Sequence, residues 1–144
     1  MSKKLIVSIL LASVFSTSAL ARDDVSDYNV AEVLASADGK SVLGDSIQFY
    51  FGEQAHSKIV NDFGEFKTNK KTNALNKSDE EACAWVFLSA MKTLKERAVK
   101  EGGNAVVNIK SNYKNNLSSS ETTFKCGAGT FVAGVALTGK VVRL

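Results

Sequence analysis

The stretch that decides the fold is residues 78–110, which read SDEEACAWVFLSAMKTLKERAVKEGGNAVVNIK. Ser78 to Glu81 match a capping box, in which a serine hydroxyl and a glutamate three residues later satisfy the free amides of a new helix. Gly102-Gly103 supplies the left-handed backbone that ends a helix. The sequence therefore predicts a helix over 79–101, whose buried face recurs at three- and four-residue spacing through Cys83, Phe87, Ala90, Met91, Leu94 and Ala98.

Strands are predicted on both sides of this helix. From Ala105 onward, Val107 and Ile109 alternate with Asn108 and Lys110, the period of two expected of a strand with one buried face. Further strands are expected over 47–51, 58–68, 121–128 and 130–142, with a short helix over 29–36, a frayed start over 22–27 and a polar turn over 115–120. The connection from the second strand through the helix is long enough for a parallel crossover. The predicted fold class is α+β, with one long helix packed across a mixed sheet of about five strands.

The first 21 residues have the pattern of a secretory signal peptide. Lys3 and Lys4 precede an apolar run, Leu5 to Phe15, and small residues follow up to Ala21. We expect cleavage after Ala21, which leaves residues 22–144 as a single periplasmic α+β domain that no proline or repeat divides. The apolar run is shorter than the roughly 20 residues that cross a bilayer, and no cysteine lies at the cleavage site, so no stable membrane anchor is expected.

The charge balance argues against nucleic-acid binding. The full chain has 18 basic and 15 acidic side chains, a net charge of +3, and removal of Lys3 and Lys4 leaves +1. A nucleic-acid-binding domain would carry a larger basic excess concentrated on one face. With one histidine and two cysteines the chain has few residues for metal or cofactor sites, and the sequence predicts no cofactor.

Cys83 and Cys126 are predicted to form a disulfide. An exported chain enters an oxidising compartment, where an even number of cysteines is paired by default. Cys83 lies on the helix face of Phe87, and Cys126 shares a strand face with Phe124, so both can point into one helix–sheet layer. A disulfide consumes the thiolates that a soft metal needs, so no metal site is predicted.

Over roughly residues 60–138 the chain contains four short motifs, which are Asp62-Phe63-Gly64-Glu65, Gly103-Asn104-Ala105-Val106-Val107, Cys126 and Gly134-Val135-Ala136-Leu137. Together these motifs resemble known bacterial families. In chain order they resemble the periplasmic domain of the lipoprotein that senses envelope stress for the Rcs phosphorelay, and the YbjQ-like family described as heavy-metal-binding. The chain is also similar to small exported bacterial proteins of unknown role, some of them labelled an excinuclease ATPase subunit. That label disagrees with the residues, because the sequence has no phosphate-binding Gly-x-x-x-x-Gly-Lys-Ser/Thr run.

The resemblance implies a non-catalytic periplasmic protein that acts through contacts with another envelope protein, in a role related to stress. Two departures from the stress sensor are the missing lipidated cysteine and a single cysteine pair where the sensor uses two disulfides. A metal-binding or metal-response protein is the alternative implied by the YbjQ-like family. An enzyme of unknown type is the third hypothesis, although the sequence has no Gly-x-Ser-x-Gly elbow or other catalytic constellation.

Five chemically versatile residues are each given an ordinary role. His56 is expected in a solvated loop rather than as a ligand or general base. Asp62 and Glu65 are three apart in a predicted strand, so alternation places them on opposite faces and argues against an acid–base pair. Trp85 and Phe87 are expected to complete the core under the helix, with a surface docking role for Trp85 as the alternative.

The candidate interaction residues are four lysines, Lys67, Lys70, Lys71 and Lys77, which are expected in a loop before the helix. A solvated connection is the simpler interpretation of this cluster. The alternative is contact with anionic lipid head groups or with an acidic envelope partner.

Self-association is a further expectation from the end of the chain. Residues 130–144 are an apolar run in which Lys140 and Arg143 are the charged residues. At the edge of a sheet such a strand would offer unpaired backbone groups to a second copy. The sequence therefore suggests a homo-oligomer that forms through the terminal strand.

Overall fold

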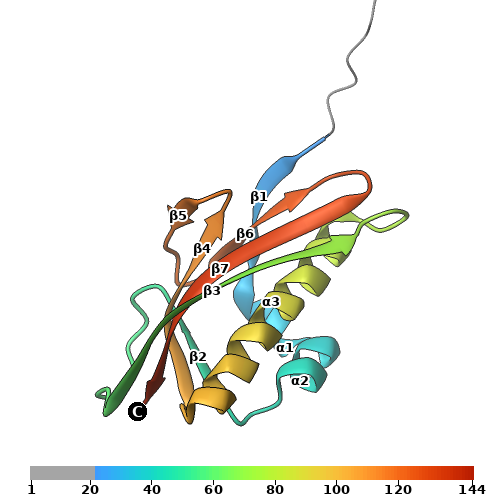
Figure 1. Cartoon of the computed structure of the whole chain (residues 1–144). Coiled ribbons are helices and arrows are strands. Elements are labelled where there is room, and N and C mark those ends of the chain that lie inside the picture. Colours follow the sequence, from blue (N-terminus) through green and yellow to red (C-terminus); the bar gives the residue numbers. More distant parts are fainter. Residues whose placement is uncertain (1–21) are drawn as a thin grey trace, which may run out of the picture.

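The computed structural model describes residues 22–144 and leaves the predicted signal peptide, residues 1–21, outside the described part (Figure 1). No helix within 22–144 is both long and apolar enough to cross a membrane. The elements in chain order are β1 (Asp24–Asn29), α1 (Val30–Ala35), α2 (Ala37–Leu43), β2 (Gln48–Phe51), β3 (Asn61–Asn73), α3 (Asp79–Glu101), β4 (Ala105–Tyr113), β5 (Asn116–Ser118), β6 (Thr123–Ala128) and β7 (Val132–Arg143).

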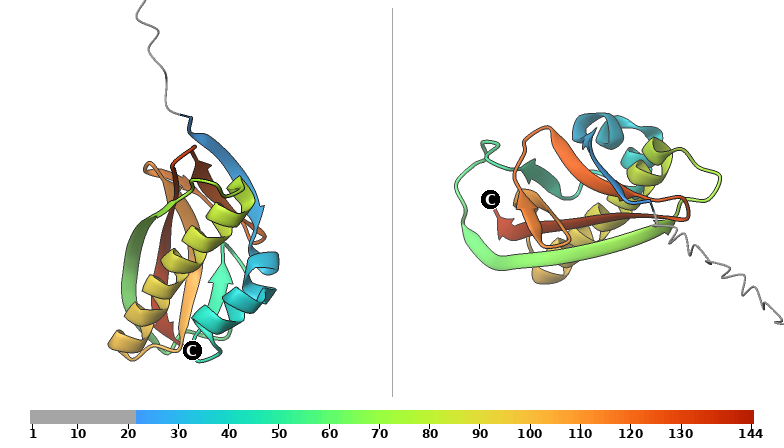
Figure 2. Two further views of the ribbon diagram at one scale, coloured as in Figure 1. Left: turned by 90° about the vertical axis from the view of Figure 1, so that its right-hand side faces the viewer. Right: turned by 90° about the horizontal axis from the view of Figure 1, so that it is seen from above.

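The strands form one mixed, curled sheet with β7 at its centre (Figures 1 and 2). One side of β7 pairs with β3 along its whole length, and the other side pairs first with β6 and then with β4. Because β3 and β4 both run antiparallel to β7, they are parallel to each other, as the predicted crossover requires. They are not neighbours, however, since β7 lies between them. The α+β class is confirmed, but the sheet has seven strands rather than about five.

Several expectations about individual segments are wrong. The segment expected to be frayed, 22–27, contains the first four residues of β1, which pairs with β6. The basic segment expected as a loop is the second half of β3. The terminal strand is the most central strand of the sheet, so it offers no free edge for a second copy. The reason given for self-association through residues 130–144 is therefore wrong.

The long helix α3 confirms the prediction at both ends. Ser78 Oγ accepts the amide of Glu81 at 3.1 Å, which is the serine half of the capping box. At the other end Gly102 has φ 82°, a left-handed conformation that costs glycine little, and the amide of Gly103 donates to Ala98 O at 2.8 Å. All six residues of the predicted face are at most 1% exposed. The signals that define this helix lie within a few residues of one another, so its predicted bounds and buried face hold in the folded protein.

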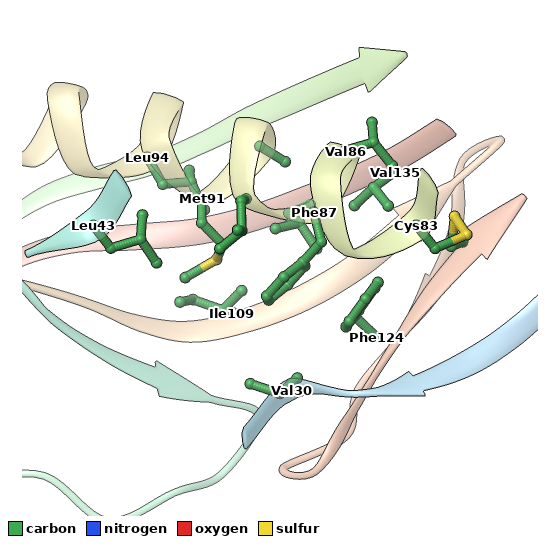
Figure 3. Packing of buried hydrophobic residues seen from close by; sticks show 14 of the residues in the cluster. Val30, Leu43, Cys83, Val86, Phe87, Met91, Leu94, Ile109, Phe124 and Val135 are labelled. Carbon is green, nitrogen blue, oxygen red and sulfur yellow. A yellow bond between two sulfur atoms is a disulfide. The ribbon is translucent and has the colours of Figure 1, made fainter. Parts of the chain in front are cut away.

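The core lies between α3 and the concave side of the sheet (Figure 3). Phe87 is fully buried and stacks on Phe124 with ring centroids 3.9 Å apart. One turn away, Cys83 and Cys126 form a disulfide with a Cα–Cα distance of 5.9 Å, consistent with the predicted pair. Trp85 was predicted to complete the core, but its side chain is 49% exposed on the other side of the helix.

Thr68 provides a test of the packing between β3 and α3. Thr68 is 6% exposed, and among the described residues its Oγ1 is one of two buried side-chain atoms without a hydrogen-bond partner. A buried hydroxyl without a partner retains its desolvation cost. We expect Thr68→Val to raise the free energy of unfolding by about 1 kcal/mol, measured by urea denaturation.

Thr93→Val is the matched control for Thr68→Val. Thr93 Oγ1 donates to Ser89 O at 3.2 Å, so this valine removes a hydrogen bond and should bring no gain in stability. A Thr68→Val protein that is no more stable than the parent would show that the hydroxyl has a partner.

Candidate functional site

A groove runs along the flank of α3 that faces α1 and α2. Three hollows of about 190, 420 and 330 Å³ follow one another along the helix. The first two share Ser36 and Ala84, and the last two share Trp85 and Leu88, so the three form one feature, named here the α3 furrow. Its lining comprises Tyr28, Asn29, Glu32, Val33, Ser36, Asp38, Ser41, Val42, Lys77, Glu80, Glu81, Ala84, Trp85, Leu88, Ser89, Lys92 and Phe124.

Helical spacing explains the α3 wall of the furrow. The lining residues of α3 from Glu80 to Lys92 recur three and four apart, which places them on one stripe of the helix. The twelve steps from Glu80 to Lys92, at 1.5 Å each, give a length of roughly 18 Å. This length suits about three turns of a helix or five to six residues of an extended chain.

The opposite wall of the furrow is the corner between α1 and α2. Ser36 sits at this corner, where its Oγ accepts the amide of Gly39 at 3.0 Å and donates to Val33 O at 2.6 Å. A Cβ on Gly39 would lie 2.2 Å from the carbonyl oxygen of Val33, so only glycine permits this close approach. These contacts fix the angle between α1 and α2. Figure 2 shows α2 beside α3, where the corner makes one side of the furrow.

Trp85 occupies the middle of the furrow, where two of its hollows meet. Its side chain is 49% exposed, whereas the neighbouring Leu88 is 3% exposed and contributes to the floor. A half-exposed indole offers a large rigid apolar surface together with an N–H donor, the combination enriched where proteins bind one another.

The sequence contained a signal for the exposure of Trp85. Trp85 lies two positions from both Cys83 and Phe87, which is roughly 200° around a helix. The spacing that turns these two residues inward therefore turns Trp85 outward. The expectation of a core role relied on residue type and did not use the position on the helix.

Charge changes sign along the furrow. The hollow next to α1 is lined by two carboxylates, Glu32 and Glu80, and the middle hollow by Asp38, Glu81 and Lys77. The last hollow has Lys92 as its charged residue. An occupant that matches this gradient has a basic end towards α1 and an acidic end towards Lys92.

The four candidate lysines do not form one site. Lys67 and Lys71 pair across the sheet with Thr138 and Gly134, while Lys70 pairs with the buried core residue Val135 and so lies on the opposite face of β3. Lys77 is in the connection to α3, where its Nζ donates to Asn73 O at 2.9 Å and its side chain lines the furrow. The cluster is thus split between a strand and the furrow.

Asp62 and Glu65 lie on the same face of β3, contrary to the expectation from simple alternation. A bulge between Asp62 and Gly64, with Gly64 at φ 99°, shifts the strand by one residue. Glu65 is opposite Lys140, and Asp62 Oδ2 lies 3.3 Å from Lys140 Nζ. The Gly64 amide and then Lys140 hold the pKa of Asp62 below its ordinary value, so this carboxylate is charged at neutral pH.

His56 and Tyr113 each have a structural partner. His56 is exposed, as expected; its Nδ1 lies 2.7 Å from Ser57 O, and its ring contacts the edge of Tyr50. Tyr113 Oη donates to Asp23 at 2.8 Å, and burial followed by this hydrogen bond raises the pKa of Tyr113 to about 12. No sequence motif indicates this Tyr113–Asp23 contact, which fixes the start of β1 to the β4–β5 hairpin.

Metal ligands are sparse in the described part of the chain. Residues 22–144 contain no group of three or more histidine, cysteine, aspartate or glutamate side chains placed to hold an ion. Both cysteine sulfurs are in the disulfide, and a thiolate site would require its reduction.

Comparisons with known proteins found no match to this chain among family models, curated proteins or solved structures. The resemblance to the Rcs stress sensor and the YbjQ-like family therefore remains a prediction from the sequence motifs.

Proposed function

We propose that this chain is a non-catalytic periplasmic protein that binds a segment of another envelope protein in the α3 furrow. The single observation that carries the proposal is the half-exposed Trp85 at the centre of a groove roughly 18 Å long. The signal-peptide pattern and the disulfide support an extracytoplasmic location. A role related to envelope stress has support only from the motif resemblance.

The charges of the furrow specify the kind of segment that fits. Its centre requires an apolar side chain that packs against Trp85 and Leu88. One end requires a basic residue for Glu32 and Glu80, and the other an acidic residue for Lys92. Such a segment binds in one direction only, because reversal would oppose like charges at both ends.

Site-specific photocrosslinking in the periplasm tests the proposal. A photoreactive phenylalanine analogue at Val42 or Ser89, on the two walls of the furrow, is expected to give the same discrete adduct with an envelope protein. Trp85→Ala should lower the adduct yield about tenfold, the effect of losing a central aromatic contact worth at least 1.4 kcal/mol. Because Trp85 is outside the core, this variant should fold, which urea denaturation would check.

The control positions for crosslinking are Val99 and Leu117, which are 59% and 60% exposed and do not line the furrow. Equal adducts from these controls would contradict a furrow-specific partner. So would an adduct that does not depend on Trp85, or one that maps to lipid or saccharide instead of protein.

A further inference from the structure

The outer edge of β3 is a second surface without a partner in the described structure. β3 has thirteen residues and pairs with β7 alone among the described strands, so its other edge presents unpaired backbone amides and carbonyls. Figure 2 shows β3 at the margin of the molecule, with α3 between it and the α1–α2 pair. The edge is therefore separate from the α3 furrow.

Three lysines of β3 have no acidic partner within the described chain. None of the ion pairs among residues 22–144 involves Lys67, Lys70 or Lys71. The lysines lie on both faces of the strand, with Lys67 and Lys71 on one and Lys70 on the other. An added strand would therefore meet positive charge whichever of its faces carried the acidic residues.

We propose that the edge of β3 binds an extended acidic segment of another protein as an added strand of the sheet. Backbone hydrogen bonds would supply the pairing, and carboxylates opposite Lys67, Lys70 and Lys71 would select the segment. The sequence cluster that was expected in a loop thereby becomes a recognition element on a strand.

The charges disfavour a second copy of this chain as the occupant. Two β3 edges would bring lysines together, which is unfavourable. The acidic edge strand β1 is neutralised within its own chain, because Asp24 pairs with Arg22, Asp27 with Lys125, and the preceding Asp23 with Lys114.

A peptide titration followed by NMR tests the proposal on the purified protein. The probe is a capped nine-residue peptide that alternates glutamate with threonine. At saturation, the β3 amides that point away from β7 are expected to exchange with solvent at least about tenfold more slowly, because strand addition gives them hydrogen-bond acceptors. The alternating peptide carries its glutamates on one face of the added strand, so they lie opposite Lys67 and Lys71 or opposite Lys70. Replacing all three lysines together with glutamine should weaken binding about tenfold through the loss of these cross-strand charge pairs.

The controls separate strand addition from charge attraction alone. The triple variant Lys40→Gln, Lys58→Gln, Lys100→Gln makes the same charge change at exposed sites outside β3, and it should bind like the parent. A glutamate peptide with alternate amides N-methylated keeps its charge but cannot pair as a strand, so it should not bind.

Four results would overturn the proposal. The first is that the methylated peptide binds as tightly as the unmethylated one, and the second is that the acidic peptide does not bind. The third is that the protein binds phosphatidylglycerol vesicles in place of the peptide, and the fourth is that light scattering shows a stable dimer that Lys71→Glu alters. The second result would mean that the lysines only protect the edge from pairing.

Discussion

Replacing Cys83 and Cys126 together with alanine is expected to lower the free energy of unfolding by about 4 kcal/mol. The disulfide joins the second turn of α3 to β6 across 43 positions of sequence. Its removal raises the conformational entropy of the unfolded chain, which is no longer closed into a long loop. Small domains are stable by about 5–15 kcal/mol, and this loss is a large part of that range. Chemical denaturation of the oxidised parent and the double variant would measure it.

Reduction of the parent protein is the control for the double alanine variant. Both changes remove the same cross-link. The denaturation midpoints of the reduced parent and of the double variant should therefore fall by similar amounts in the same denaturant. A double variant within about 1 kcal/mol of the oxidised parent would contradict a stabilising disulfide. Two free thiols in the protein purified from the periplasm without reductant would contradict the pairing itself.

Phe87→Ala is expected to cost about 4 kcal/mol, within the range for deletion of a buried aromatic ring. Phe87 is 0% exposed, stacks on Phe124 and also contacts Phe51 with ring centroids 6.1 Å apart. Its removal would leave a cavity between α3 and the sheet, where α3 faces β6 and β2 (Figure 3). The free energy of unfolding from urea denaturation is the measurement.

Val99→Ala is the matched control for Phe87→Ala, because Val99 is on the same helix and 59% exposed. Its effect should stay within about 0.5 kcal/mol. If Phe87→Ala does not fold, Phe87→Leu keeps most of the volume and should cost about 1.5 kcal/mol. A loss below 0.5 kcal/mol for both Phe87 variants would mean that this ring is not central to the core.

Local signals in the sequence determined the long helix and its buried face. A capping serine, a glycine stop and apolar residues at helical spacing act within a few residues of one another, so the tertiary fold did not need to supply them. The period of two likewise indicated β4, and the apolar runs indicated β2, β6 and β7. The signal-peptide pattern and the even cysteine count indicated the disulfide.

Tertiary pairing decided what the polar segments became. Residues 67–73 are rich in lysine, asparagine and threonine and have no apolar alternation, so locally they are typical of a loop. They form a strand because β7 pairs with β3 along its whole length, from Asn61 to Asn73. Strand formation depends on the neighbour as much as on the residues, and the neighbour is distant in sequence.

The order of the strands and the candidate site were also decided only by the tertiary structure. Nothing local distinguishes a central from an edge apolar strand, so the sequence left the place of β7 in the sheet open, and the structure puts it at the centre. The α3 furrow needs the α1–α2 corner beside α3, and the free edge of β3 exists because β7 pairs on one side only. Both surfaces are made of residues far apart in the chain, whose proximity comes from packing rather than from local sequence.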